Sequence, residues 1–145
     1  MQLILNHNLW ETMRNHVESC SPVEACGLLA GKDISVREVF LITNQTQSPV
    51  RFRMDPIEQL HAFDQMEVMG LDLLGIFHSH PSGPETLSAT DIAEATYPVV
   101  QVIWSPLSQQ SPMADIQHQG YWQARGFWIE NGRALEVTLQ ITDDE

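Results

Sequence analysis

The spacing of hydrophobic and polar residues predicts a strand followed by a helix at the start of the chain. Gln2–Asn6 has the short apolar pattern of a strand. Residues 9–20 repeat apolar side chains at steps of three and four, which is typical of an amphipathic helix. Asn8 stands three residues before Glu11, so we expect this pair to cap the helix, and Ser21-Pro22 should end it.

The next part of the chain predicts an apolar segment and two strands. Residues 23–30 are mostly apolar, and residues 31–33 form a predicted turn. Residues 34–43 are rich in β-branched and apolar side chains, which favours a strand. A polar stretch at residues 44–48 leads to a further predicted strand at residues 50–54.

A second helix has the clearest start in the sequence. Asp55 stands at the N-cap position, Pro56 at the first helical position and Glu58 at the third. Gly70 is a natural stop. The predicted apolar stripe consists of Ile57, Leu60, Phe63 or Ala62, and Met66 or Val68.

The longest nearly continuous apolar run, residues 71–77, predicts a central strand that is buried on both faces. Residues 78–84 are rich in proline and glycine and predict a loop. A third helix is predicted at residues 88–97 and another buried strand at residues 99–104. Residues 105–117 are polar and turn-like.

The C-terminal part predicts a hairpin. Its strands are residues 120–129 and 133–141, joined at Asn131-Gly132, which is a strong turn signal. The whole pattern predicts an α/β fold with a mixed central β-sheet flanked by helices. With 145 residues the chain has the length of one domain, so we expect residues 1–145 to form a single domain.

Charge and cysteine content narrow the classes of function. Seven basic and nineteen acidic residues give a net charge of −12, which disfavours nucleic acid as a partner. No apolar run approaches the roughly 20 residues of a membrane span, and the N-terminus lacks the basic start of a signal peptide. Cys20 and Cys26 are too few for a disulfide framework, so we expect free thiols in a cytoplasmic protein.

Two histidines and an aspartate stand where a metal could be held. His78 and His80 follow the predicted central strand and are two residues apart, so their side chains point the same way. Asp91 lies in the first turn of the next predicted helix, which the loop folds back toward the histidines. Two imidazoles and one carboxylate leave a fourth position for water, which is the composition of a catalytic zinc site.

Glu24 and Ser88 are the candidate catalytic residues. Glu24 is an acidic residue in an apolar segment, and a second carboxylate is needed to carry the proton of an attacking water. Ser88 could donate a hydrogen bond to the oxyanion formed in acyl transfer. Ordinary explanations exist as well: His-Ser-His can be a polar loop, Ser88 and Asp91 can cap a helix, and Glu24 can face solvent or form an ion pair.

Taken together, these residues resemble the motif of a known family. Glu24 lies upstream, residues 78–80 are His-Ser-His, and residues 88–91 are Ser-Ala-Thr-Asp after a gap of seven. This pattern resembles the JAMM (MPN+) metalloprotease motif, and the resemblance extends over nearly the whole chain. It implies the JAB/MPN fold, which is related to the cytidine-deaminase architecture.

The resemblance also implies roles and a reaction. It implies one zinc ion per chain bound by His78, His80 and Asp91, with Glu24 as general base and Ser88 as stabiliser of the intermediate. The implied reaction is hydrolysis of a peptide or isopeptide bond after the C-terminal glycine of a ubiquitin-like protein. The chain lacks room for long insertions, so a minimal prokaryotic-type enzyme is implied. Its implied partner is a small ubiquitin-fold or sulfur-carrier protein with a Gly-Gly tail.

Two other functions remain open. One is a non-catalytic scaffold domain of the same fold, although such domains typically lack some of the ligands. The other is a relative of the RadC-type proteins, whose loop also contains His-x-His-Pro-Ser-Gly, but the net charge of −12 disfavours DNA. A zinc nucleobase deaminase is excluded, because that class needs a Pro-Cys-x-x-Cys motif beside its His-x-Glu, and no Pro-Cys-x-x-Cys occurs here.

Overall fold

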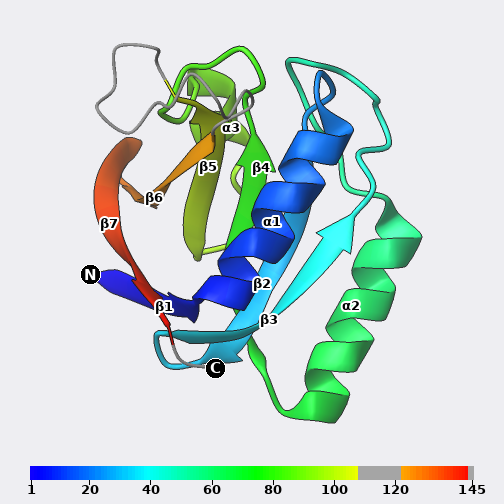
Figure 1. The fold of residues 1–145 in the computed structure, drawn as a ribbon, viewed down its shortest axis with the longest axis vertical. Coiled ribbons are helices and arrows are strands. Elements are labelled where there is room, and N and C mark those ends of the chain that lie inside the picture. Colours follow the sequence, from blue (N-terminus) through cyan, green and yellow to red (C-terminus); the bar gives the residue numbers. More distant parts are fainter. Residues whose placement is uncertain (108–121, 144–145) are drawn as a thin grey trace.

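The computed structural model describes residues 1–107 and 122–143, which contain seven strands and three helices in the order β1, α1, β2, β3, α2, β4, α3, β5, β6, β7 (Figure 1). The helices are α1 (His7–Cys20), α2 (Pro56–Met69) and α3 (Ala89–Glu94). The strands are β1 (Gln2–Asn6), β2 (Cys26–Lys32), β3 (Ser35–Ile42), β4 (Asp72–Ser79), β5 (Val100–Pro106), β6 (Trp122–Glu130) and β7 (Arg133–Thr142).

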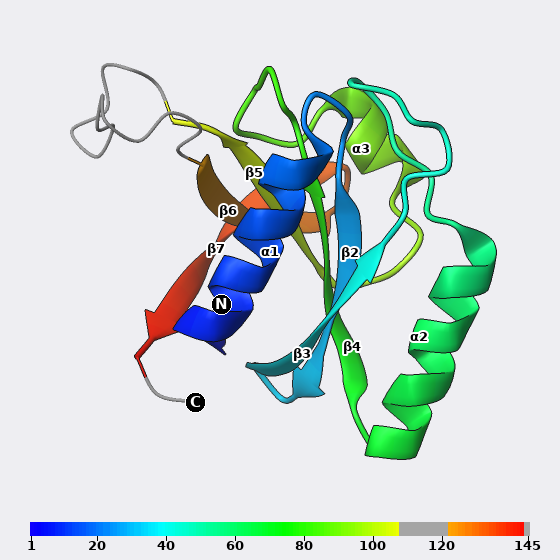
Figure 2. The same ribbon diagram turned by 45° about the vertical axis from the view of Figure 1, so that its right-hand side comes forward.

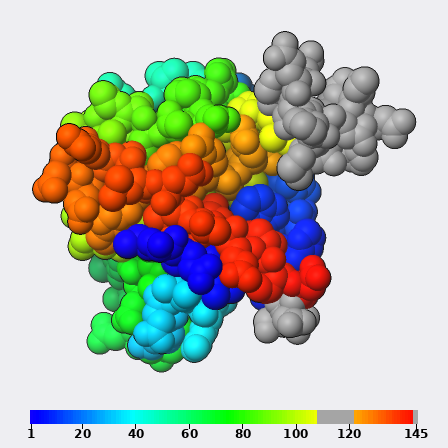
Figure 3. Space-filling view, turned by 90° about the vertical axis from the view of Figure 1, so that its left-hand side faces the viewer, coloured from blue at the N-terminus to red at the C-terminus, as the bar shows by residue number. Residues whose placement is uncertain are grey.

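The strands form a mixed sheet, as predicted, and this sheet closes into a barrel in the order β1-β3-β2-β4-β5-β6-β7. At its centre β4 lies antiparallel to β2 and parallel to β5. The first strand closes the ring, because β1 pairs in parallel with β7 along its whole length and with β3 at Ile4 and Ser35. Figure 3 shows β1 in blue beside β7 in red.

Helices α1 and α2 cover opposite faces of the layer formed by β2, β3 and β4 (Figure 2). The alternation of side chains along β2 explains this arrangement. Leu29 packs in one core cluster with Met13 and Val17 of α1. Leu28 belongs to the other cluster, together with Met66 of α2. The prediction of a sheet flanked by helices is therefore confirmed.

The structure corrects two predictions near the N-terminus and in the middle of the chain. Helix α1 is capped by Asn6, whose side chain accepts a hydrogen bond from the Leu9 amide at 2.8 Å, so the prediction that Asn8 is the cap is wrong. Residues 50–54 do not form a strand and contribute only an isolated bridge between Met54 and Asn44. The Arg51 carbonyl and the Arg53 amide are hydrogen-bonded to the Asn44 side chain instead of to a neighbouring strand.

Other boundaries shift because of tertiary contacts. β4 continues through His78 and Ser79, since β5 pairs with both residues, whereas the prediction placed His78 in a loop. Helix α3 ends at Glu94, short of the predicted residue 97, and buries none of its residues, so no packing extends it. The turn after β2 lies at residues 33–34, because β2 and β3 still pair at Lys32 and Ser35.

The remaining predictions concern α2, the hairpin and the cysteines. In α2 only Ala62 and Met66 are buried, and the other predicted stripe residues are partly or largely exposed. The hairpin turn at Asn131-Gly132 is confirmed by positive φ at both residues. Residues 108–121, which include most of the predicted polar stretch, lie outside the described part.

Both cysteines are free thiols. Among the described helices, none combines the length and apolar character that a bilayer span requires.

Candidate metal centre

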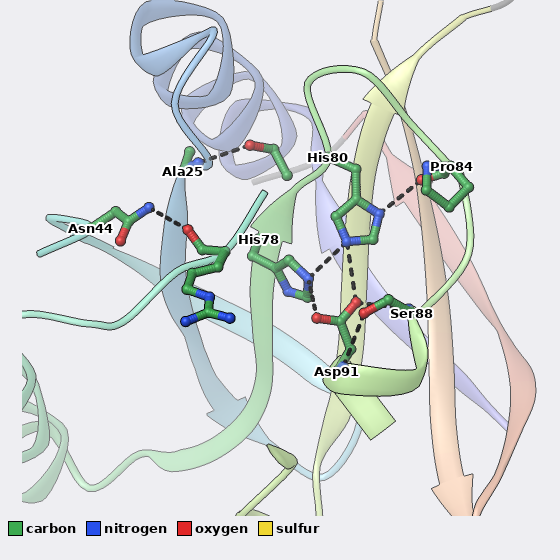
Figure 4. Close-up of polar contacts among 9 residues, drawn as sticks. Ala25, Asn44, His78, His80, Pro84, Ser88 and Asp91 are labelled. Carbon is green, nitrogen blue, oxygen red and sulfur yellow. Dashed lines mark hydrogen bonds and ion pairs between the residues drawn. The ribbon is translucent and has the colours of Figure 1, made fainter. Parts of the chain in front are cut away.

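His78 and His80 stand at the end of β4, where the sheet holds the backbone on both sides. His78 pairs with Cys26 of β2 and Ile103 of β5. The His80 amide continues this ladder by donating to the Trp104 carbonyl at 2.8 Å. Because the two histidines are two residues apart on extended backbone, both buried rings turn to the same side (Figure 4).

Asp91 is brought to the histidines by a capping box at the start of α3. The Ser88 amide donates to Asp91 Oδ2 at 2.8 Å, and the Asp91 amide donates to Ser88 Oγ at 3.0 Å. Ser88 and Asp91 thus cap the helix, and this cap is compatible with a place for Asp91 beside the two histidines. Since Ser88 Oγ acts only as an acceptor in this cap, its hydroxyl proton remains available for another acceptor.

The three candidate ligand side chains have the spacing of a zinc coordination sphere. Nε2 of His78 and Nε2 of His80 are 3.2 Å apart. Asp91 Oδ1 lies 3.3 Å from His78 Nε2, and Oδ2 lies 3.1 Å from His80 Nε2. In a tetrahedron with zinc–ligand bonds of about 2.0–2.1 Å, neighbouring ligand atoms are about 3.3 Å apart. The three side chains are therefore close enough together to bind one zinc ion, with a fourth position open.

Neighbouring groups hold both rings in this orientation. His80 Nδ1 lies 2.8 Å from the Pro84 carbonyl, and the hydrogen bond between them requires the proton on Nδ1 and leaves the Nε2 lone pair facing the site. Phe52 stacks on the His78 ring at a centroid distance of 4.4 Å. His78 Nδ1 is buried without a hydrogen-bond partner among the described residues. Both imidazoles therefore offer Nε2 as the ligand atom.

The charge of this group comes from Asp91. Burial by itself would raise the pKa of Asp91, but hydrogen bonds from His78, His80 and the Ser88 amide outweigh it and hold the pKa well below its usual range. Burial lowers the pKa of His78. Burial also acts to lower the pKa of His80, but contacts with Asp91 and Pro84 outweigh it and raise the pKa. A permanent carboxylate between two imidazoles is a suitable donor set for a divalent cation.

Glu24 lies beside this group, on the short stretch that precedes β2. Its side chain is only 4% exposed and forms no ion pair within residues 1–107 and 122–143, so the explanation of a solvent-facing glutamate is wrong. Burial raises the pKa of Glu24 to about 7; the charge of His80 opposes this rise and that of Asp91 adds to it. The cluster of possible ligands within 4.8 Å of one another contains His78, His80 and Asp91 but not Glu24.

The raised pKa of Glu24 predicts how the stability of the metal-free protein depends on pH. The folded state holds the Glu24 proton up to about pH 7, whereas the unfolded chain releases it near 4.5. Stability should therefore fall as pH rises between these values, by up to about 3 kcal/mol. We expect metal-free Glu24→Gln to gain stability over wild type at pH 8 and little at pH 4.5, as measured by urea unfolding. An equal gain at both pH values would contradict this prediction.

A pocket of about 340 Å³ opens onto the candidate ligands. His78 and Asp91 form part of its wall. One flank is formed by residues 52–54 and the start of α2, and the other by the end of α3 and residues 95–97. An extended peptide lying in this pocket would pass directly beside the ligand atoms.

Sequence reasoning missed three residues that shape the surroundings of the candidate site. Ser79, between the two histidines, accepts a hydrogen bond from the Ala25 amide at 2.8 Å and so holds the residue next to Glu24 (Figure 4). Asn44 is a buried hydrogen-bonding residue, and Phe52 covers the His78 ring. The local pattern does not single out Ser79, because it predicts a loop at residues 78–84, and the strand extends to Ser79 only in the structure.

Comparison with known proteins agrees with this geometry. Residues 6–121 match the family described as prokaryotic homologs of the JAB domain. The chain belongs to this family. The predicted resemblance to JAMM-type proteins is therefore confirmed at the level of the family.

Two relatives are similar to more than half of this chain. Desampylase of Pyrococcus furiosus is 43% identical over 88 residues, which cover 60% of this chain and 63% of that protein. A probable TtuB-protein conjugate cleaving protease of Thermus thermophilus is 39% identical over 103 residues, which cover 70% of this chain and 69% of that protein. The match thus spans slightly less than two thirds of the desampylase.

Solved structures share this fold. The solution structure of a protein from Desulfitobacterium hafniense has a TM-score of 0.82 at 32% identity and covers 99% of this chain and 94% of that one. A JAB1/MPN domain protein from Archaeoglobus fulgidus has a TM-score of 0.55 at 16% identity, over 95% and 97% of the two chains. The predicted JAB/MPN fold is confirmed.

Proposed function

We propose that this protein is a zinc-dependent peptidase that binds one zinc ion through His78, His80 and Asp91 and uses Glu24 as general base. The observation that carries the proposal is the set of ligand-atom distances of 3.1–3.3 Å at the wall of a pocket. Three protein ligands with an open fourth position are typical of catalytic zinc, whereas structural zinc sites are closed.

Each residue in the site has a chemical task under this proposal. Zinc, when bound, would lower the pKa of a water molecule and polarise the carbonyl of the scissile bond. The Glu24 carboxylate takes a proton from the attacking water and delivers it to the leaving amine, and a pKa near neutrality suits both transfers. The Ser88 hydroxyl, whose proton is not used in the helix cap, donates a hydrogen bond to the developing oxyanion.

We propose a small ubiquitin-fold or sulfur-carrier protein with a Gly-Gly tail as substrate. The names of the relatives, desampylase and TtuB-protein conjugate cleaving protease, support a protein conjugate. The pocket supports an extended tail, because the peptide groups of Phe52 make no hydrogen bond to other described residues and can pair with a strand-like ligand. The two free cysteines support a reducing, cytoplasmic location.

Cleavage of a defined fusion tests this function. We expect the zinc-loaded protein to cut a ubiquitin-fold protein from a reporter directly after the second glycine of its tail, as shown by the mass of the products. A chelator should abolish cleavage and added zinc should restore it, while the same fusion with an Ala-Ala tail should remain intact. A zinc-loaded protein that cuts no Gly-Gly fusion would favour the scaffold function.

A further inference from the structure

Glu24 lies just outside the sheet, next to Ala25, whose amide and carbonyl are hydrogen-bonded to Ser79 of β4. The amide and carbonyl of Glu24 itself have other partners. β2 begins only at Cys26, two residues after Glu24. The Glu24 amide donates to the Ser48 carbonyl at 2.9 Å, and the Glu24 carbonyl accepts from Asn44 Nδ2 at 3.0 Å. Both contacts come from residues 44–54, which we name the pocket segment. The amide and the carbonyl of Glu24 are therefore both hydrogen-bonded to the pocket segment.

Asn44 is the residue that organises this arrangement. Its side chain is buried, at 5% exposure, and its Nδ2 donates to the carbonyls of Glu24 and Arg51, each at 3.0 Å. Its Oδ1 accepts from the amides of Thr46 and Arg53 at 3.1 and 3.0 Å, and also from the Thr46 hydroxyl. The buried amide thus uses both donor hydrogens and its acceptor oxygen within the molecule.

The same segment reaches the candidate ligands and the pocket. Phe52 stacks on the His78 ring, and Phe52, Arg53 and Met54 line the pocket. Arg51 and Arg53, on either side of Phe52, are the residues whose backbones bind Asn44. A substrate in the pocket therefore contacts a segment that is joined to the backbone of Glu24 through the Asn44 side chain and the Ser48 carbonyl.

We infer that Asn44 is a positioning residue, which sets the place of the Glu24 carboxylate by joining its backbone to the pocket segment. This inference rests on the proposed function and deepens it. A displacement of about 1 Å at a catalytic group can cost about 100-fold in rate. The ordinary alternative is that Asn44 only stabilises the loop, and the two roles predict different results in an enzyme that lacks the base.

A double-mutant cycle separates these roles. We expect Asn44→Ala to lower kcat by about 100-fold in the otherwise wild-type protein, with zinc content unchanged. In the Glu24→Gln protein the same substitution should lower kcat by less than about threefold, because its effect passes through a base that is already absent. Equal losses in both backgrounds, or an unchanged kcat in a folded Asn44→Ala protein, would overturn the inference. Asn8→Ala, which makes the same change at an exposed position of α1, is the matched control and should retain full activity.

Amide hydrogen exchange supplies a readout that needs neither substrate nor activity. We expect Asn44→Ala to speed exchange of the Glu24 amide by at least about tenfold, while amides in β4 and β5 keep their protection. Asn44→Asp is the second variant, since it keeps the acceptor contacts to Thr46 and Arg53 and removes both donor contacts. Unchanged exchange at Glu24 in both variants would overturn the inference. A wild-type protein without zinc or peptidase activity would contradict the proposed function instead. The exchange result would still show whether Asn44 holds the backbone of Glu24 in place.

Discussion

Glu24→Gln is expected to bind zinc normally and to lose about 10²–10⁴-fold in kcat, which is the typical contribution of a general base. Glutamine has the size of glutamate but cannot take up a proton at neutral pH. The candidate ligands His78, His80 and Asp91 remain in place, because Glu24 lies outside their cluster. Zinc content by mass spectrometry and kcat on a Gly-Gly fusion measure the two halves of this expectation.

The matched control for this substitution is Glu67→Gln, which makes the same chemical change at an exposed position of α2. It should retain the wild-type kcat. Normal turnover by Glu24→Gln would remove Glu24 from the mechanism. Loss of zinc from Glu24→Gln would instead make Glu24 a further ligand, which the open coordination position does not require.

Asp91→Ala is expected to lose most of its zinc and with it all measurable peptidase activity. A zinc ion held by His78 and His80 alone would keep two protein ligands, fewer than the three of catalytic sites. It would also lose the only carboxylate among the possible ligands within 4.8 Å of one another. Wild type should contain about one zinc per chain after purification without a chelator, with the ratio measured by mass spectrometry.

The capping role of Asp91 requires a second variant. Asp91 Oδ2 accepts a hydrogen bond from the Ser88 amide, so Asp91→Ala removes a cap as well as a ligand. Asp91→Asn retains an acceptor for the cap and removes the negative charge, and it too should lose zinc. Asp64→Ala, at an exposed position of α2, is the control for removing a carboxylate. Full zinc occupancy in both Asp91 variants would contradict the ligand assignment.

The sequence by itself determined the parts of this protein that depend on local pattern. The spacing of His78 and His80 on extended backbone places two rings on one side, and the structure has their Nε2 atoms 3.2 Å apart. Asp55, Pro56 and Gly70 predicted both ends of α2, since caps act within a few residues of the helix that they end. The continuous apolar run predicted β4 as a central strand, because a strand buried on both faces needs apolar residues at every position.

The tertiary structure alone decided what depends on residues far apart in the chain. Closure of the barrel requires β1 to pair with β7, and nothing local in Gln2–Asn6 indicates that partner. The burial that raises the pKa of Glu24 comes from its surroundings in the fold, and the backbone of Glu24 is held by Asn44, twenty residues along the chain. The sequence pattern identifies which residues can perform chemistry. Long-range strand pairing sets the distances between these residues, and burial sets their protonation. Both depend on segments that are far apart in the chain and meet only in the folded protein.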